Sequence, residues 1–139
     1  MEFNKYTDRS LLQYCLGATM YMPGTKDFAG AILNQKYPGL TSMVLCFEDA
    51  CKEEDVPSAE KNSIELLNIL SEQMKLGNIT YKELPLLIFR VRNFEQFKHF
   101  SEMLEPKHIK LITGFNFPKF NSQNGEAYYS YLKELNEKY

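Results

Sequence analysis

The residues best suited to chemistry are charged side chains that follow short apolar runs. Glu48 and Asp49 stand side by side after such a run, and Arg90 comes at the end of another. Loops after the strands of parallel α/β folds carry the chemistry, so a carboxylate pair there could transfer a proton. A guanidinium beside it could bind a substrate carboxylate through two hydrogen bonds. Two simpler readings stay open: the acids are solvated turn residues, and Arg90 forms an ion pair with one of them.

Four apolar runs, each followed by a helical pattern, would position these side chains. The run from Met43 to Phe47 is unbroken, which is typical of a strand buried on both faces of a parallel sheet. Strands and helices that alternate with short connections predict βαβ units with right-handed crossovers. We therefore expect an α/β fold with four parallel strands in sequential order, near residues 16–22, 42–48, 86–91 and 111–117.

Turn residues and apolar periodicity predict the helices. Thr25 can cap a helix after Pro23-Gly24, and a second helix begins at residues 55–58 and closes at Gly77. A stripe of Phe, Met and Leu over residues 94–104 indicates a helix whose aromatic face belongs to the core. We expect His99 within this helix and His108 in the loop after it to be structural or exposed. A closing helix spans residues 126–139.

Length and composition limit the class of protein. The 139 residues are 44% hydrophobic with a formal net charge of −2, which indicates one ordinary domain over residues 1–139. This balance gives no electrostatic reason to expect a nucleic-acid or membrane partner. No apolar run approaches the ~20 residues that span a bilayer. Cys15, Cys46 and Cys51 are odd in number and fit no zinc pattern, so we expect reduced thiols in a cytoplasmic protein.

The ends of all four predicted strands carry turn residues or charged residues. They are Pro23-Gly24 with Lys26 just beyond, Glu48-Asp49, Arg90 with Arg92, and Pro118-Lys119. If the strands are parallel neighbours, these acids and bases meet at one rim of the sheet. Lys119 could equally be a solvated loop lysine.

Four stretches at these strand ends also resemble the motifs of a known family. They are Gly17–Thr25, the segment ending Phe47-Glu48-Asp49-Ala50, Phe89–Asn93 and Gly114–Lys119. In this order they resemble the HpcH/HpaI aldolase and citrate lyase β-subunit family. Within that family, they resemble most the citrate-lyase-like carbon–carbon lyases encoded beside tellurium-resistance genes.

The resemblance implies a TIM (β/α)₈ barrel that makes or breaks carbon–carbon bonds next to a carboxylate or acyl-CoA thioester, with Mg²⁺. By motif, Arg90 would hold the substrate carboxylate or carbonyl, with Arg92 as the alternative. Glu48 and Asp49 would orient metal-bound water or transfer protons. The residues lining the pocket would be Pro23, Gly24 and Lys119.

Two departures from the family qualify this expectation. Cys46 stands where family members usually carry an acid. A barrel needs ~250 residues, whereas this sequence has four βα units and lacks the fifth and sixth strands that carry the family's direct metal ligands. We therefore expect the N-terminal half of such a barrel, inactive alone. Either a homo-oligomer or a missing C-terminal half would cover apolar residues of its inner face, namely Val44, Leu45, Ile88 and Leu111.

A small flavodoxin-like signalling or binding domain of the receiver type is the alternative, because it would be complete at this length. Such a phosphoacceptor needs another Asp at the end of a middle strand, where this sequence has Arg90. A strand order of 2-1-3-4 with helices on both faces would identify that fold. A third possibility is an interaction module that kept the fold and lost the chemistry.

Overall fold

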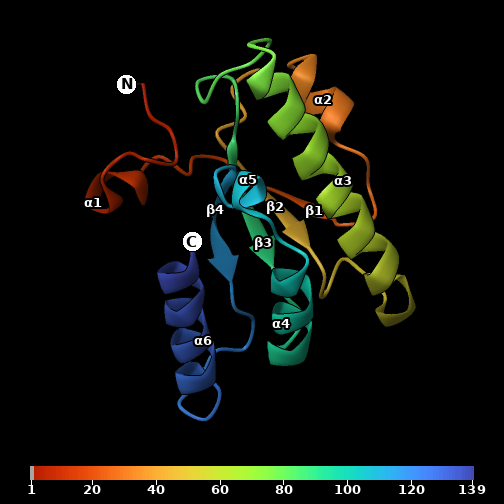
Figure 1. Ribbon diagram of the computed structural model, residues 1–139, viewed down its shortest axis with the longest axis vertical. Coiled ribbons are helices and arrows are strands. Elements are labelled where there is room, and N and C mark those ends of the chain that lie inside the picture. The colour runs from red at the N-terminus through yellow and green to blue at the C-terminus, as the bar shows by residue number, and fades with distance from the viewer. Residues whose placement is uncertain (1) are drawn as a thin grey trace.

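The computed structural model describes residues 2–139 and contains one four-stranded parallel sheet. The strands lie side by side in the order β1-β2-β3-β4, as the sequence predicted (Figure 1). Their bounds are β1 Met20–Pro23, β2 Ser42–Cys46, β3 Leu86–Arg90 and β4 Ile112–Asn116. The first strand starts later than residue 16, because Gly17 has a left-handed backbone (φ 59°) and the Leu16 carbonyl accepts side-chain hydrogen bonds.

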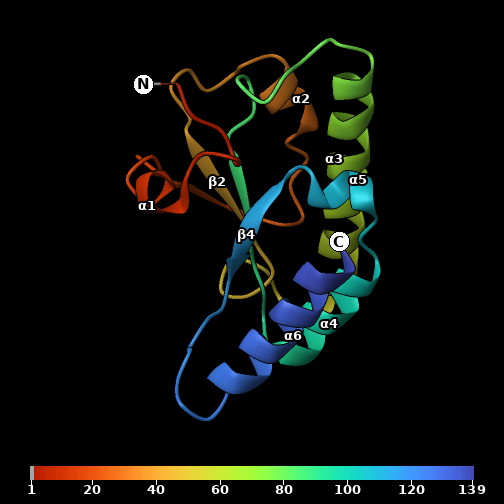
Figure 2. The same ribbon diagram turned by 60° about the vertical axis from the view of Figure 1, so that its left-hand side comes forward.

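Within residues 2–139, six α-helices and one 3₁₀ turn, η1, accompany the strands. Their bounds are α1 Arg9–Leu12, α2 Ala29–Leu33, η1 Glu53–Asp55, α3 Val56–Lys75, α4 Phe94–Glu102, α5 Pro106–Ile109 and α6 Gly125–Lys138. Helices α3 to α6 lie on one side of the sheet and α1 lies on the other (Figure 2). Sequential strands with right-handed crossovers place every connecting helix on the same face, as in a segment of a TIM barrel. The flavodoxin-like alternative is therefore wrong.

Two local predictions about helices need correction. Thr25 does not cap α2; the helix starts at Ala29, whose backbone N–H donates to the Asp27 side chain at 3.0 Å. The predicted loop around His108 is the short helix α5, which begins with Pro106 at its first turn. A reciprocal pair of hydrogen bonds between Glu105 and His108 caps this helix, which explains why so short a segment is helical.

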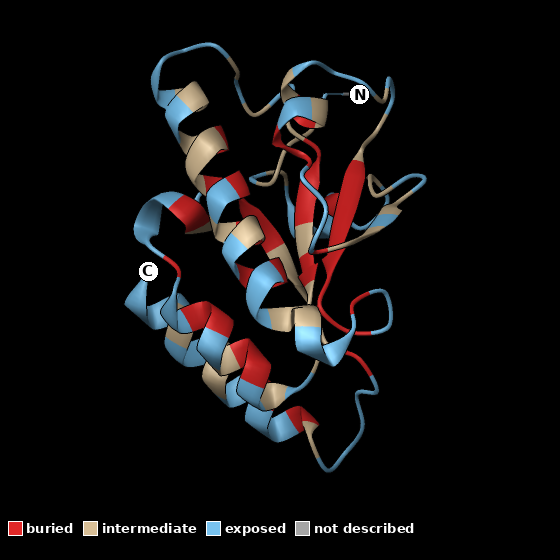
Figure 3. Ribbon diagram, turned by 90° about the vertical axis from the view of Figure 1, so that its right-hand side faces the viewer, coloured by how far each residue is buried: buried red, intermediate tan, exposed pale blue. Residues whose placement is uncertain are grey.

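The main core lies between the sheet and its helices. Phe47, which directly follows β2, and Phe89 of the neighbouring β3 pack on Phe100 of α4, with ring centroids 4.9–5.9 Å apart. All three rings are fully buried, which confirms that the aromatic face of α4 belongs to the core. Met103, at the end of that stripe, is instead 36% exposed. In Figure 3 the buried residues are concentrated on the strands and on the inward faces of the helices.

The inner face of the sheet is better covered than the sequence predicted. Val44, Leu45 and Leu111 are 1–4% exposed within the single chain, and Ile88 is half-buried. Leu45 and Leu111 belong to the core on the helix side. On the opposite face, residues of the N-terminal segment, including Leu12, line a pocket together with Ile88. The expected exposure of these residues is therefore wrong, while self-association itself stays a prediction.

His108 is a buried polar residue whose ring links α5 and its N-cap residue to α3. Its Nδ1 accepts from the Glu105 backbone N–H at 3.1 Å, and Nε2 lies 2.9 Å from Asn68 Oδ1 on α3. The acceptor role of Nδ1 places the single proton of a neutral ring on Nε2. Burial, with the nearby charge of Lys107, lowers the pKa of His108 below 6.5.

We expect this lowered pKa to make the fold less stable in mild acid. Below pH 6.5 the unfolded chain binds a proton that the folded ring resists, so the stabilising contribution is complete above pH 6.5 and is lost as the pH falls. Denaturant unfolding of the wild type and of His108→Gln between pH 7.5 and 5 would measure this. The variant should show a flatter dependence, and identical slopes would contradict the assignment.

No helix within residues 2–139 is long and apolar enough to cross a membrane. The three cysteines are free in the described part of the chain.

Candidate active site at the carboxyl ends of the strands

The strand register brings the predicted polar residues to one rim of the sheet. Cys46 at the end of β2 pairs with Arg90 at the end of β3, and Arg90 pairs with Asn116 at the end of β4. The next charged side chains, Glu48, Asp49, Arg92 and Lys119, come two or three residues after these positions. Glu48 and Asp49 follow β2 within two or three residues, so they lie beside the Arg90 side chain.

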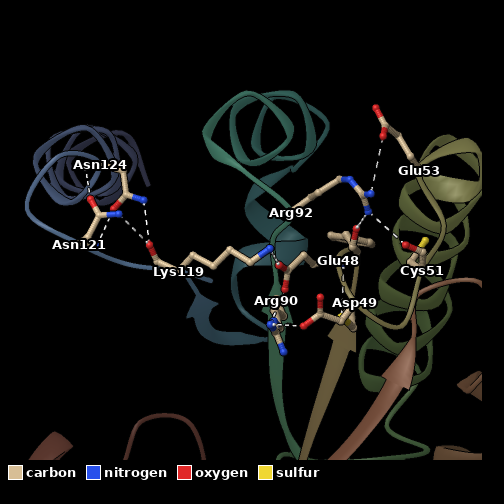
Figure 4. Close-up of polar contacts among 11 residues, drawn as sticks. Glu48, Asp49, Cys51, Glu53, Arg90, Arg92, Lys119, Asn121 and Asn124 are labelled. Atoms are coloured by element: carbon tan, nitrogen blue, oxygen red, sulfur yellow. Dashed lines mark hydrogen bonds and ion pairs between the residues drawn. The ribbon is translucent and has the colours of Figure 1, made fainter.

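Arg90 is the centre of this cluster (Figure 4). Its Nη2 group donates to Glu48 Oε2 and also to Asp49 Oδ2, the latter at 2.8 Å. Lys119, from the loop after β4, places its Nζ 3.1 Å from Glu48 Oε1. That contact is an ion pair without hydrogen-bond alignment, since Oε1 has no aligned donor within residues 2–139. The simpler reading of Arg90, an ion pair with the acids, is therefore confirmed.

Burial differs sharply across the cluster. The Glu48 side chain is 7% exposed and Arg90 is 23% exposed, whereas Asp49 is 68% exposed. Burial opposes the charge of Arg90, but the neighbouring acids, Glu48 first, more than offset it and raise its pKa above the ordinary value. Arg90 therefore stays a cation. Only one oxygen of Asp49, Oδ2, is engaged in residues 2–139, so its other oxygen faces no competing cation.

One nitrogen of Arg90 is still available as a hydrogen-bond donor. Its Nε is buried and has no hydrogen-bond partner within the described chain. A buried donor of a charged group without a partner is unfavourable. A ligand oxygen placed next to the cluster would satisfy it.

Arg92 has a different role, although the motif left the two arginines equivalent. Its Nη1 donates to the backbone carbonyls of Phe47 and Cys51, both at 3.1 Å, and its Nη2 lies 3.8 Å from Glu53 (Figure 4). These contacts hold both ends of the loop that carries Glu48 and Asp49. Arg92 thus supports the loop after β2, whereas Arg90 is the arginine that contacts the acid pair.

Pro23 and Gly24 occupy the end of β1. Gly24 is buried: its backbone N–H donates to the Cys46 carbonyl, and a Cβ added there would lie 2.9 Å from the Phe47 ring. The glycine therefore permits close packing on the helix side of the sheet. Pro23 is half-buried and pairs with Cys46. Neither residue contacts the charged cluster through a hydrogen bond.

The Lys119 backbone is held by two asparagine side chains. Lys119 has a left-handed φ of 51°, and its carbonyl accepts from Asn121 Nδ2 at 3.3 Å and Asn124 Nδ2 at 3.1 Å. The side chain itself is 82% exposed as it reaches toward Glu48. Local hydrogen bonds thus fix the backbone position from which this exposed lysine side chain extends.

Sequence reasoning missed two polar residues beside the cluster. Asn116, opposite Arg90 in the register, donates through Nδ2 to the Tyr21 hydroxyl at 3.2 Å. Tyr21 belongs to β1 and Asn116 to β4, so this contact spans the inner face of the sheet from one edge strand to the other. A polar residue at the end of β4 was a usable signal, but nothing local in the sequence connected it with Tyr21.

The cluster does not fit a directly bound Mg²⁺. Both oxygens of Glu48 and one of Asp49 already face a guanidinium or ammonium group, which would repel a cation. Residues 2–139 contain no group of three or more His, Cys, Asp or Glu side chains that could hold a metal ion. The Cys46 sulfur, at the position where the resemblance implied an acid, accepts a weak hydrogen bond from the Glu48 backbone N–H at 3.4 Å.

Comparison with known proteins identifies one family. A family model described as C-C_Bond_Lyase of the TIM-Barrel fold matches residues 10–139, which covers the whole sheet and the charged cluster. No curated protein and no solved structure matches the chain.

Proposed function

Because the chain belongs to the family of carbon–carbon bond lyases with the TIM-barrel fold, we propose that its charged cluster is the carboxylate-binding part of a lyase active site. The observation that supports this proposal is the hydrogen bonding of the Arg90 guanidinium. One end of its guanidinium is held by Glu48 and Asp49, while its buried Nε has no partner in residues 2–139. A held guanidinium with a free donor is suited to a substrate carboxylate or carbonyl oxygen.

The substrate class that fits this cluster is a carboxylate, or an acyl-CoA thioester, with a hydroxyl group on the carbon beyond the bond to be broken. We propose the citrate lyase β-subunit type as the finer assignment within the family. Arg90 and Lys119 would face the negatively charged end of the substrate, and the Tyr21 hydroxyl is a further donor on the same face.

Cleavage of such a substrate needs a base and a charge acceptor. A carboxylate removes the proton of the substrate hydroxyl, the carbonyl forms, and the electron pair of the broken bond moves onto the carbon next to the carboxylate or thioester. Asp49 is the better base because one of its oxygens is unengaged and exposed. Glu48, with both oxygens facing cations, is the residue that positions Arg90 and Lys119.

We propose that cleavage of the substrate requires Mg²⁺. Residues 2–139 do not fit the ion, so no direct ligand of it is assigned to them. The cluster's cations already face Glu48, so they offer limited stabilisation for the charge that develops on the carbon fragment. The steps assigned to this chain are therefore binding, orientation and proton transfer.

We expect the 139-residue chain to bind malyl-CoA or citryl-CoA without turning them over. Isothermal titration would measure binding, and product analysis with and without Mg²⁺ would measure cleavage. Absence of binding to either thioester and to free malate would refute the carboxylate site. Turnover that disappears on adding a chelator would contradict the expected inactivity and the missing metal site.

A further inference from the structure

A pocket separate from the charged cluster lies between β4, α6 and the N-terminal segment. Its volume is about 420 Å³, within the range of small-molecule sites. In Figure 1, β4 is the strand next to α6 and to the N-terminal segment with α1. Its apolar wall consists of Ile109, Ile112, Phe115, Leu132 and Leu135. We refer to this cavity as the Lys5–Arg9 pocket.

Two cations from the N-terminal segment line the pocket without a counter-charge. Lys5 Nζ donates to the Ile109 carbonyl, and Arg9 Nη1 donates to the Thr113 carbonyl at 3.3 Å. Neither side chain forms an ion pair with a carboxylate within residues 2–139. Burial, and then the charge of Arg9, lower the pKa of Lys5 to about 8. An anion between the two groups would remove this repulsion.

Thr113 provides an independent sign of a missing ligand. The residue is 8% exposed, and its hydroxyl is buried without a hydrogen-bond partner in the described chain. It lines the Lys5–Arg9 pocket and also an adjoining pocket of about 250 Å³, in which Leu12 and Leu16 add apolar surface. An unpaired buried hydroxyl is uncommon in native proteins, and a ligand oxygen would satisfy it.

We propose that the Lys5–Arg9 pocket binds a linear aliphatic monocarboxylate, with the carboxylate between Lys5 and Arg9 and the chain along the apolar wall. Charge complementarity selects an anion, and the wall selects a hydrocarbon chain rather than a small inorganic ion. The Thr113 hydroxyl is a donor for the same head group. This site is separate from the proposed lyase cluster and shares no residue with it.

Titration with octanoate, octanol and acetate tests the proposal on the full chain. Octanoate should bind at least tenfold more tightly than either of the others, because each lacks the charge or the hydrocarbon chain. Lys5→Gln and the nearly isosteric Thr113→Val should each weaken octanoate binding severalfold. Lys61→Gln, an exposed lysine on α3, is the matched control and should not change it. Equal binding of acetate and octanoate, or equal binding by Lys5→Gln, would overturn the proposal.

The pKa of Lys5 gives a readout that does not depend on variants. NMR of ¹³C-methylated lysines should show one group titrating near pH 8, and octanoate should raise that value. No change at saturating octanoate would count against the site. Sedimentation tests whether a second copy of the chain fills the pocket instead of a small molecule. A dimer that Leu135→Asp dissociates, and that octanoate does not affect, would show this and would also overturn the proposal.

Discussion

Replacing Arg90 by glutamine should weaken the binding of a carboxylate or thioester ligand by about 100-fold, while the equivalent change at Arg92 should not. Hydrogen bonds to charged groups contribute about 1.5–3 kcal/mol each, and Arg90 is the arginine that lies against the acid pair with a donor free. In Arg90→Gln, Glu48 keeps Lys119 as a partner, so the fold should survive. Titration of the folded variant with malyl-CoA gives the loss directly.

Arg92→Gln is the matched variant, because it removes the same charge two residues away. It loses two hydrogen bonds to the carbonyls of Phe47 and Cys51, so we expect the free energy of unfolding to fall by about 1–3 kcal/mol. Ligand affinity should change by less than tenfold at temperatures where the variant is folded. If Arg92→Gln abolished binding and left stability unchanged, the substrate arginine would be Arg92 instead.

The sequence could not separate these two arginines for a geometric reason. Residues two apart in a strand point to the same face, so alternation treats Arg90 and Arg92 alike. The difference arises because β3 ends at Arg90, and the chain then turns so that Arg92 reaches the loop after β2. The end of a strand is the least predictable part of it, and here it decides which contacts the two arginines make.

Other parts of the fold followed from local patterns. The unbroken apolar run of β2 and the polar residues directly after it predicted both the buried strand and the position of Glu48 and Asp49. Alternation also shows why one prediction failed: Val44 and Leu45 are neighbours in a strand, so they cannot both face the inner side. Only Val44 does, since Leu45 belongs to the core on the helix side.

The contacts that no local pattern predicted join distant parts of the chain. Tyr21 and Asn116 are 95 residues apart and meet only because the edge strands of one sheet are close enough for a tyrosine to reach across. The N-terminal segment likewise contacts β4 through side chains more than 100 residues away, as Arg9 does with Thr113. Such contacts depend on how the completed sheet curves, which periodicity does not specify.

Glu48→Gln should be among the most destabilising changes at the rim, at about 2–4 kcal/mol of unfolding free energy. Glu48 is 7% exposed and faces both Arg90 and Lys119, so the amide would leave two cations without their shared counter-charge. Removing one partner of a buried pair costs about 3–5 kcal/mol, and partial exposure of Arg90 together with its contact to Asp49 reduces that figure. Denaturant unfolding at pH 7 would measure it.

Asp49→Asn is the control, since it removes the other carboxylate that contacts the same Arg90 nitrogen. Asp49 is 68% exposed, so its loss should cost less than about 1 kcal/mol. The double variant Glu48→Gln/Arg90→Gln should recover part of the loss, because the amide no longer faces a largely buried guanidinium that keeps only the exposed Asp49 as a partner. A coupling energy of about 1–3 kcal/mol between the two sites would show that Glu48 holds Arg90 in place. Strictly additive effects would mean that Arg90 is positioned by the strand alone, and that Glu48 is free to act as the base in place of Asp49.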